Sequence, residues 1–70
     1  MIITVTRFES NGLKFSSLVN IHNISYIVPF NIRVTNIHNH IGSQIFMCDQ
    51  SSFGVTETIE QIREMIESVK

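Results

Sequence analysis

The chain has 70 residues, an apolar fraction of 43% and a formal net charge of −1 at pH 7. A domain of this size buries only about 60% of the surface that its unfolded chain exposes, so a disulfide, a metal or self-association usually supports it. Because Cys48 is the only cysteine, an intrachain disulfide is excluded, and with it the class of secreted, disulfide-stapled domains. The five Lys and Arg residues are scattered, whereas nucleic-acid-binding proteins gather their cations into a stripe. We therefore expect no nucleic-acid partner.

Targeting and membrane-spanning segments are not predicted either. Residues 1–7 lack the basic start, the long apolar run and the small-residue cleavage site of a signal peptide. No apolar run approaches the roughly 20 residues of a membrane-spanning helix. We expect a cytoplasmic protein that does not associate with a membrane.

The first expected elements are two strands joined by a tight turn. The chain holds twelve Ile and six Val against two Leu and no Ala, and β-branched side chains favour a pleated sheet. Residues 2–8 alternate between two faces, with Ile3 and Val5 on the same face, as the period of a strand requires. Residues 9–12 contain Asn-Gly, which favours a hairpin turn, and a second strand is expected over residues 13–19.

The middle of the chain is predicted to continue the sheet. Residues 20–23 interrupt the extended pattern and residues 24–30 resume it, with Pro29 placing this third strand at a sheet edge or ending it. Residues 31–43 are rich in Asn and His, and they are interpreted as a loop that retains some strand character. The remaining extended segments are residues 44–49 and 53–55, joined by a turn over residues 49–52.

A single amphipathic helix is expected at the C-terminus. Thr58 is a suitable N-cap, and Gln61 stands three residues later, which is the spacing of a capping box. The apolar residues then recur with helical spacing and form one stripe: Ile59, Ile62, Met65, Ile66 and Val69. The acidic residues of this segment are assigned to its solvated side: Glu57, Glu60, Glu64 and Glu67. The sequence thus predicts one α+β domain over residues 1–70, an antiparallel sheet of four to five strands with one C-terminal amphipathic helix.

A resemblance to a known family rests on three segments. They are residues 1–8, Leu18-Val-Asn20 with Ile24 and Ile27, and residues 53–62. Together they resemble the FlbD/SwrD-type small flagellar accessory proteins and similar short phage proteins. The chain departs from that pattern by the long segment 31–43, where the family has a short turn, and by Thr56, where the family has Lys. The resemblance implies a sheet-plus-helix fold and a bacterial or phage accessory role, and it supplies no catalytic residues.

Catalytic and metal chemistry find little support in the sequence. His38 and His40 stand two residues apart, but a structural zinc site needs four ligands, and His22, Cys48 and Asp49 complete no characteristic spacing. The sequence contains no motif of a phosphate-binding loop, a dinucleotide fold, a serine hydrolase or a zinc protease. We expect a protein that is not an enzyme and holds neither metal nor cofactor. Cys48, placed on a strand, is interpreted as a small buried hydrophobe.

One polar cluster is a candidate ligand site. Its residues, which could bind a ligand or a partner, are Arg33, Asn36, His38, Asn39 and His40. A guanidinium gives paired hydrogen bonds to phosphate or carboxylate. An oligomer could therefore sequester an anionic small molecule, such as a signalling nucleotide. The other interpretation is a surface loop that is simply polar.

Self-association is expected from the number of apolar faces. The third strand has apolar residues on both sides, with Ile27 on one side and Tyr26, Val28 and Phe30 on the other. The strand at 44–49 is also apolar on both sides. One helix covers only one face of such a sheet, so the other face needs a partner unless the sheet coils into a partly closed barrel. The interface candidates are Tyr26, Val28, Phe30 and Phe46. We therefore predict a non-enzymatic binding module, a homodimer or higher oligomer, that docks on or inhibits a partner protein through its apolar sheet face or a strand edge.

Overall fold

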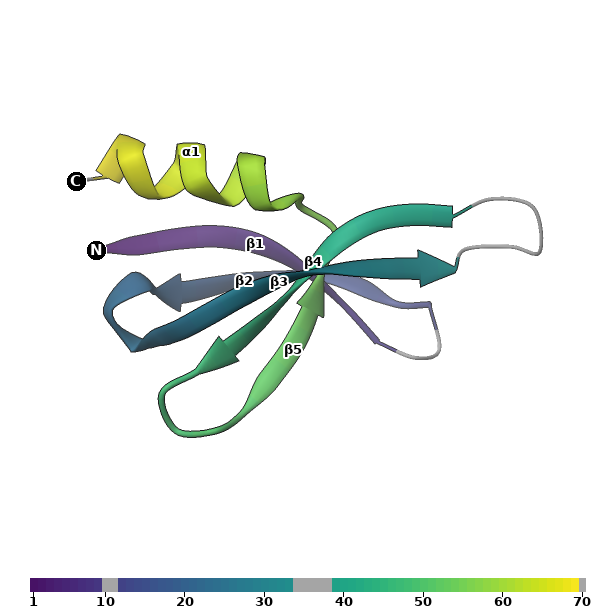
Figure 1. Ribbon diagram of the computed structural model, residues 1–70, viewed down its shortest axis with the longest axis horizontal. Coiled ribbons are helices and arrows are strands. Elements are labelled where there is room, and N and C mark those ends of the chain that lie inside the picture. The colour runs from purple at the N-terminus through teal and green to yellow at the C-terminus, as the bar shows by residue number, and fades with distance from the viewer. Residues whose placement is uncertain (10–11, 34–38, 70) are drawn as a thin grey trace.

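The computed structural model describes residues 1–9, 12–33 and 39–69. In this part of the chain the elements are β1 (Ile2–Phe8), β2 (Lys14–Asn20), the 3-10 helix η1 (Ile21–Asn23), β3 (Ile24–Arg33), β4 (Asn39–Met47), β5 (Ser52–Val55) and α1 (Ile59–Val69) (Figure 1). The strands form one antiparallel sheet in the order β2-β1-β5-β4-β3. The predicted α+β class, with one C-terminal helix on an antiparallel sheet, is confirmed.

The hairpin of β1 and β2 forms as its sequence predicts. The two strands pair in continuous register from Ile2 opposite Asn20 to Phe8 opposite Lys14. In the turn, Gly12 has φ +88° and its N–H donates to the carbonyl oxygen of Glu9 over 2.9 Å. A residue without a Cβ adopts a positive φ at the lowest cost, so Gly12 suits this turn.

The hairpin of β3 and β4 corrects the interpretation of residues 31–43 as a loop with some strand character, at the positions that the structure describes: residues 31–33 and 39–43 are strand, and residues 34–38 lie outside the described part. β3 continues through Pro29 to Arg33, β4 begins at Asn39, and their ladder includes the pairs Asn31 with Ile41 and Arg33 with Asn39. Pro29 is tolerated because β3 is an edge strand of the sheet. The edge position was predicted correctly, whereas the end of the strand at Pro29 was wrong. Asn and His are weak strand formers alone, but pairing with a neighbouring strand overrides such preferences.

The turn between β4 and β5 also begins earlier than expected. β4 ends at Met47, and Cys48 is an exposed residue of the turn instead of a buried hydrophobe. Its backbone N–H donates to the carbonyl oxygen of Asn23 over 2.7 Å. Oδ1 of Asp49 accepts hydrogen bonds from the N–H and the hydroxyl of Ser51, over 2.9 and 2.6 Å. A carboxylate that binds the backbone two residues later is a typical turn former, which explains why the strand stops here.

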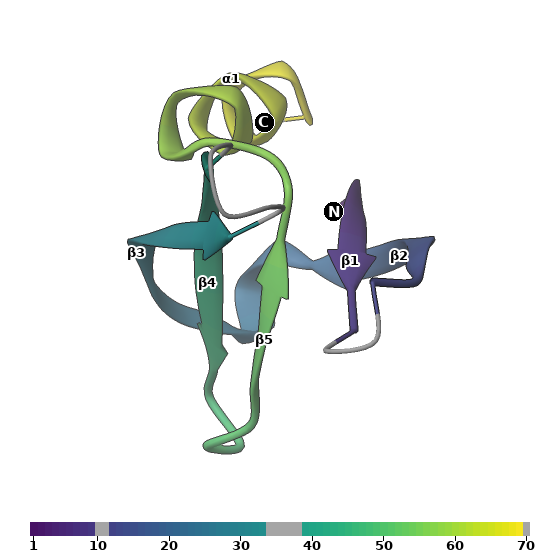
Figure 2. The same cartoon turned by 90° about the vertical axis from the view of Figure 1, so that its right-hand side faces the viewer.

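The sheet consists of two parts that meet at a narrow junction. Between β1 and β5, only Arg7 and Val55 are paired in the ladder. The β1–β2 hairpin is therefore free to turn away from the β3–β4–β5 part, and the two parts are strongly rotated relative to each other (Figure 2). β2 and β3 are the two edges of the sheet. The described sheet is thus open and does not form a closed barrel.

The core lies between the two parts of the sheet and the helix. It contains the buried residues Ile3, Val5, Val19, Ile45, Val55 and Ile62. We call the side of the sheet that carries these residues the inner face and the opposite side the outer face. The start of β1 and the end of α1 lie at the same end of the molecule (Figure 1).

The helix α1 is capped and oriented as its sequence predicts. The backbone N–H of Thr58 donates to Oε1 of Gln61 over 2.8 Å, and the N–H of Gln61 donates to the hydroxyl of Thr58 over 3.2 Å. These reciprocal bonds form the predicted capping box. Ile62 has no exposed surface, while Met65 and Ile66 are half-buried against the core. The apolar stripe therefore faces the inner face of the sheet.

Candidate functional site

The outer face carries an aromatic pair that the helix does not cover. Tyr26 on β3 lies opposite Phe46 on β4, and their rings stack at a centroid distance of 4.4 Å and an interplanar angle of 13°. Tyr26 is 54% exposed, whereas Phe46 is half-buried. Stacking fixes the Phe46 ring beneath Tyr26 and leaves a flat aromatic surface toward the solvent.

A second aromatic pair extends this surface toward β1. The ring of Phe30 on β3 lies 6.3 Å from the ring of Phe8 on β1. Phe8 crosses the outer face over Gly54 of β5, where an added Cβ would come within 2.6 Å of ring carbons of Phe8. Gly54 therefore provides the space that the ring needs. Phe30 is 40% exposed, so the aromatic surface spans three strands.

The structure thus brings the four predicted interface residues onto one face. Tyr26, Val28 and Phe30 alternate with Ile27, which faces the core. Phe46 lies on the same side because it is the direct cross-strand partner of Tyr26. We call Tyr26, Val28, Phe30 and Phe46, with Phe8, the outer aromatic patch.

The predicted polar cluster is only partly visible. Asn36 and His38 lie outside the described residues. Arg33 and Asn39 form the last described pair of the β3–β4 ladder, and their side chains are also outside the described part. His40 is exposed, and its Nε2 donates to the carbonyl oxygen of Thr56 over 2.6 Å. Where the structure describes the cluster, His40 therefore serves to tie β4 to the segment between β5 and α1.

Glu57 has a role that the sequence analysis missed. It precedes the helix instead of lying on its solvated side, and it is half-buried. Its two carboxylate oxygens accept hydrogen bonds from the N–H of Thr6, over 2.9 and 3.1 Å. The hydroxyl of Ser43, which is fully buried, donates to the Glu57 carbonyl oxygen over 2.8 Å. Glu57 therefore joins β1, β4 and the start of α1 at the junction of the two parts of the sheet.

A pocket on the inner face lies at the end of the sheet that the helix does not reach. The β4–β5 hairpin extends away from α1 (Figure 2), and its turn contributes Cys48, Asp49 and Ser51 to the pocket wall. Arg7 and Asn23 line the same pocket. The guanidinium carbon of Arg7 lies 4.4 Å from the ring centroid of Phe53 and 5.5 Å from that of Phe15.

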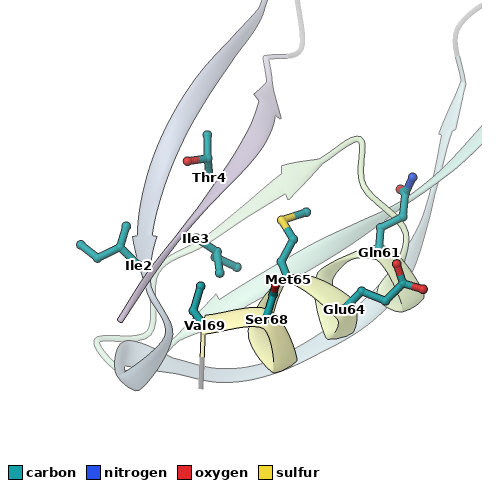
Figure 3. A pocket seen from close by; sticks show the side chains of 8 residues that line it. All are labelled: Ile2, Ile3, Thr4, Gln61, Glu64, Met65, Ser68 and Val69. Atoms are coloured by element: carbon teal, nitrogen blue, oxygen red, sulfur yellow. The ribbon is translucent and has the colours of Figure 1, made fainter.

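A second, shallower groove marks the seam between α1 and β1. Figure 3 shows Met65 and Val69 of the helix on the side of β1 that carries Ile3, while Ile2 points to the other side of the strand. The groove also contains Glu64, which is exposed. Because Ile3 is buried in the core and Met65 packs against it, we interpret the groove as the margin of the core.

The part of the chain that the structure describes contains neither a cluster of metal ligands nor a helix that could span a membrane. No group of three or more His, Cys, Asp or Glu side chains is arranged to hold a metal ion there. Within the same ranges, α1 is too short and too polar to cross a lipid bilayer.

Comparison with protein-family models, with curated proteins and with solved structures gave no match. The resemblance to FlbD/SwrD-type proteins therefore stays an expectation from the sequence.

Proposed function

We propose that the chain is a non-enzymatic binding module that docks on another protein through the outer aromatic patch. The observation that carries this proposal is the stacked pair of Tyr26 and Phe46, with Tyr26 54% exposed on the face opposite the helix. Exposed aromatic residues are enriched at the energetic centres of protein interfaces. Tyr26 supplies a large apolar ring with a hydroxyl that can bind a polar group at the rim.

The position of the patch beside an edge strand adds to this proposal. β3 is an edge strand of the sheet. A strand of the partner could therefore pair with the outer edge of β3, and the side chains of that partner strand would cover Tyr26 and Phe30. Pro29 has no N–H and interrupts the donors of that edge, which limits continuous pairing and favours a short partner segment. In the absence of the partner, we propose that a second copy of the chain covers the same patch.

The test is a comparison of tagged baits in an extract of the native cell. The wild-type chain is expected to retain a defined partner that Tyr26→Asp loses, because a carboxylate in a desolvated interface opposes docking. Ile41→Asp is the matched control, since Ile41 is 62% exposed and lies on the opposite side of β4 from Phe46. Equal retention of that partner by all three baits would show that the outer aromatic patch is not the docking surface.

The other function considered from the sequence is sequestration of an anionic small molecule around Arg33. Its residues Asn36 and His38 lie outside the described part of the chain, and His40 is engaged with Thr56. No observation on that segment favours this function over protein docking.

A further inference from the structure

We propose that the inner-face pocket at Arg7 binds an oxyanion, the carboxylate or phosphate group of a small molecule. This site is separate from the outer aromatic patch, because Arg7 and Val55 form a cross-strand pair and Val55 belongs to the core on the inner face. The inference does not rest on the docking function, and each can fail without the other.

Arg7 is held between two aromatic rings. β1 lies between β2 and β5 in the sheet, so Phe15 on β2 and Phe53 on β5 flank the guanidinium from both neighbouring strands. Contact with aromatic rings stabilises the cation and restricts its side chain. A guanidinium that is restricted before binding loses less entropy when an anion arrives.

The Arg7 guanidinium has no carboxylate partner among the residues that the structure describes. No acidic side chain there forms an ion pair with it, and it lies against the two rings. A guanidinium carries five N–H donors in one plane, and contact with ring faces does not consume them. These donors match the geometry of a carboxylate or phosphate group, which binds in the guanidinium plane through paired hydrogen bonds.

The wall of the pocket is otherwise mostly neutral. Asn23 lines it with Arg7, and a side-chain amide can supply further neutral donors. Asp49 is the one acidic residue among the lining residues, and it is charged at neutral pH as an aspartate ordinarily is; hydrogen bonds from Ser51 lower the pKa of its carboxyl further. Asp49 therefore weakens the attraction of the pocket for an anion, which makes its removal an informative change.

The test is a titration of ¹⁵N-labelled protein with inorganic phosphate and, separately, with acetate, followed by NMR. Saturable shifts are expected at the Asn23 side-chain amide and at the amides of Ser51–Phe53, for one probe or both. The probe that binds more tightly identifies the ligand group as phosphate or carboxylate. An absence of saturable shifts for both probes well into the millimolar range would overturn the proposal.

Three variants show whether the site works as described. Arg7→Gln should abolish the shifts, and Arg7→Lys should weaken binding because a point charge does not reproduce the planar fork. Asp49→Asn should tighten binding about twofold to fivefold, the effect of one exposed charge. Arg63→Gln is the control, since it removes the same charge from the exposed side of α1 and should leave binding unchanged.

These variants also separate binding from folding. Because Arg7 contacts residues of both parts of the sheet, each variant is first compared with the wild type by circular dichroism. If Arg7→Gln does not fold, the decision rests on Asp49→Asn, whose substitution lies in an exposed turn. Weaker anion binding by Asp49→Asn would contradict the proposal and indicate a ligand with a positive group.

Discussion

At the scale of single residues, Glu57 compensates for the early end of β5. β5 stops at Val55, yet the N–H of Thr6 on β1 still needs an acceptor, and the Glu57 carboxylate takes the place of a strand carbonyl. The next backbone bond, from the N–H of Thr56 to the carbonyl oxygen of Thr6 over 2.9 Å, holds the same junction. The joint between the two parts of the sheet thus depends on a side chain where the backbone ladder is short.

Replacing Glu57 by Ala should therefore lower the free energy of unfolding by about 1–3 kcal/mol, because a part-buried donor loses a charged acceptor. Glu57→Gln should cost less, since its amide oxygen can still accept. Urea unfolding measures both values, with Glu64→Ala as the control because Glu64 is exposed on the helix. Equal stability of Glu57→Ala and Glu64→Ala would mean that this bond contributes nothing.

The sequence did not reveal Glu57 because the information is not local. Thr6 and Glu57 are 51 positions apart. The sequence around Glu57 alone predicts a solvated side chain, because a Glu next to the start of a helix is usually exposed. Cys48 was misassigned for a related reason, because the length of β4 depends on where the Asp49 turn begins. By contrast, strand alternation alone places Tyr26, Val28 and Phe30 on one side of β3. That Phe46 joins them depends on the register of β3 and β4.

At the scale of elements, local patterns predicted α1 best and the β3–β4 hairpin worst. The helix has a capping box and an apolar stripe within one segment. This short stretch of sequence therefore predicts that a helix forms, where it begins and which of its sides is buried. The alternation of apolar residues continues through Phe30 and Ile32 to the end of β3, but it is missing at the start of β4. There the strand extends because it has a partner beside it. Such pairing decides strand assignment where composition alone suggests a loop.

Ile62 tests how far the fold depends on the helix. Its side chain is fully buried in the shared core, so Ile62→Ala should lower the free energy of unfolding by about 2–5 kcal/mol through lost burial and a cavity. In so small a domain that loss approaches the whole stability. Thermal unfolding provides the measurement, and Val69→Ala, at a position that is 37% exposed, is the control. An unchanged melting temperature for Ile62→Ala would reject the packing of α1 on the sheet.

At the scale of the whole molecule, coverage of the sheet is unequal. α1 packs on the inner face, where the two parts of the sheet and the helix share one core. On the outer face the described structure places no element over the outer aromatic patch, and Tyr26 and Phe30 remain 54% and 40% exposed. A contiguous aromatic surface of this kind is uncommon on a small monomer, so a cover from outside the chain is expected.

A symmetric homodimer is the simplest such cover, because a two-fold axis brings the same patch of two copies together. Each chain has a mass of 8.0 kDa, so light scattering at micromolar concentration should give about twice that mass for the wild type. Phe46→Asp should return the mass to that of one chain with the helix intact by circular dichroism, because a charge buried at the interface disfavours association. Ile41→Asp, on the other side of β4, should remain dimeric. A wild-type mass that stays at 8.0 kDa on concentration would leave the patch exposed in the free protein and reject self-association.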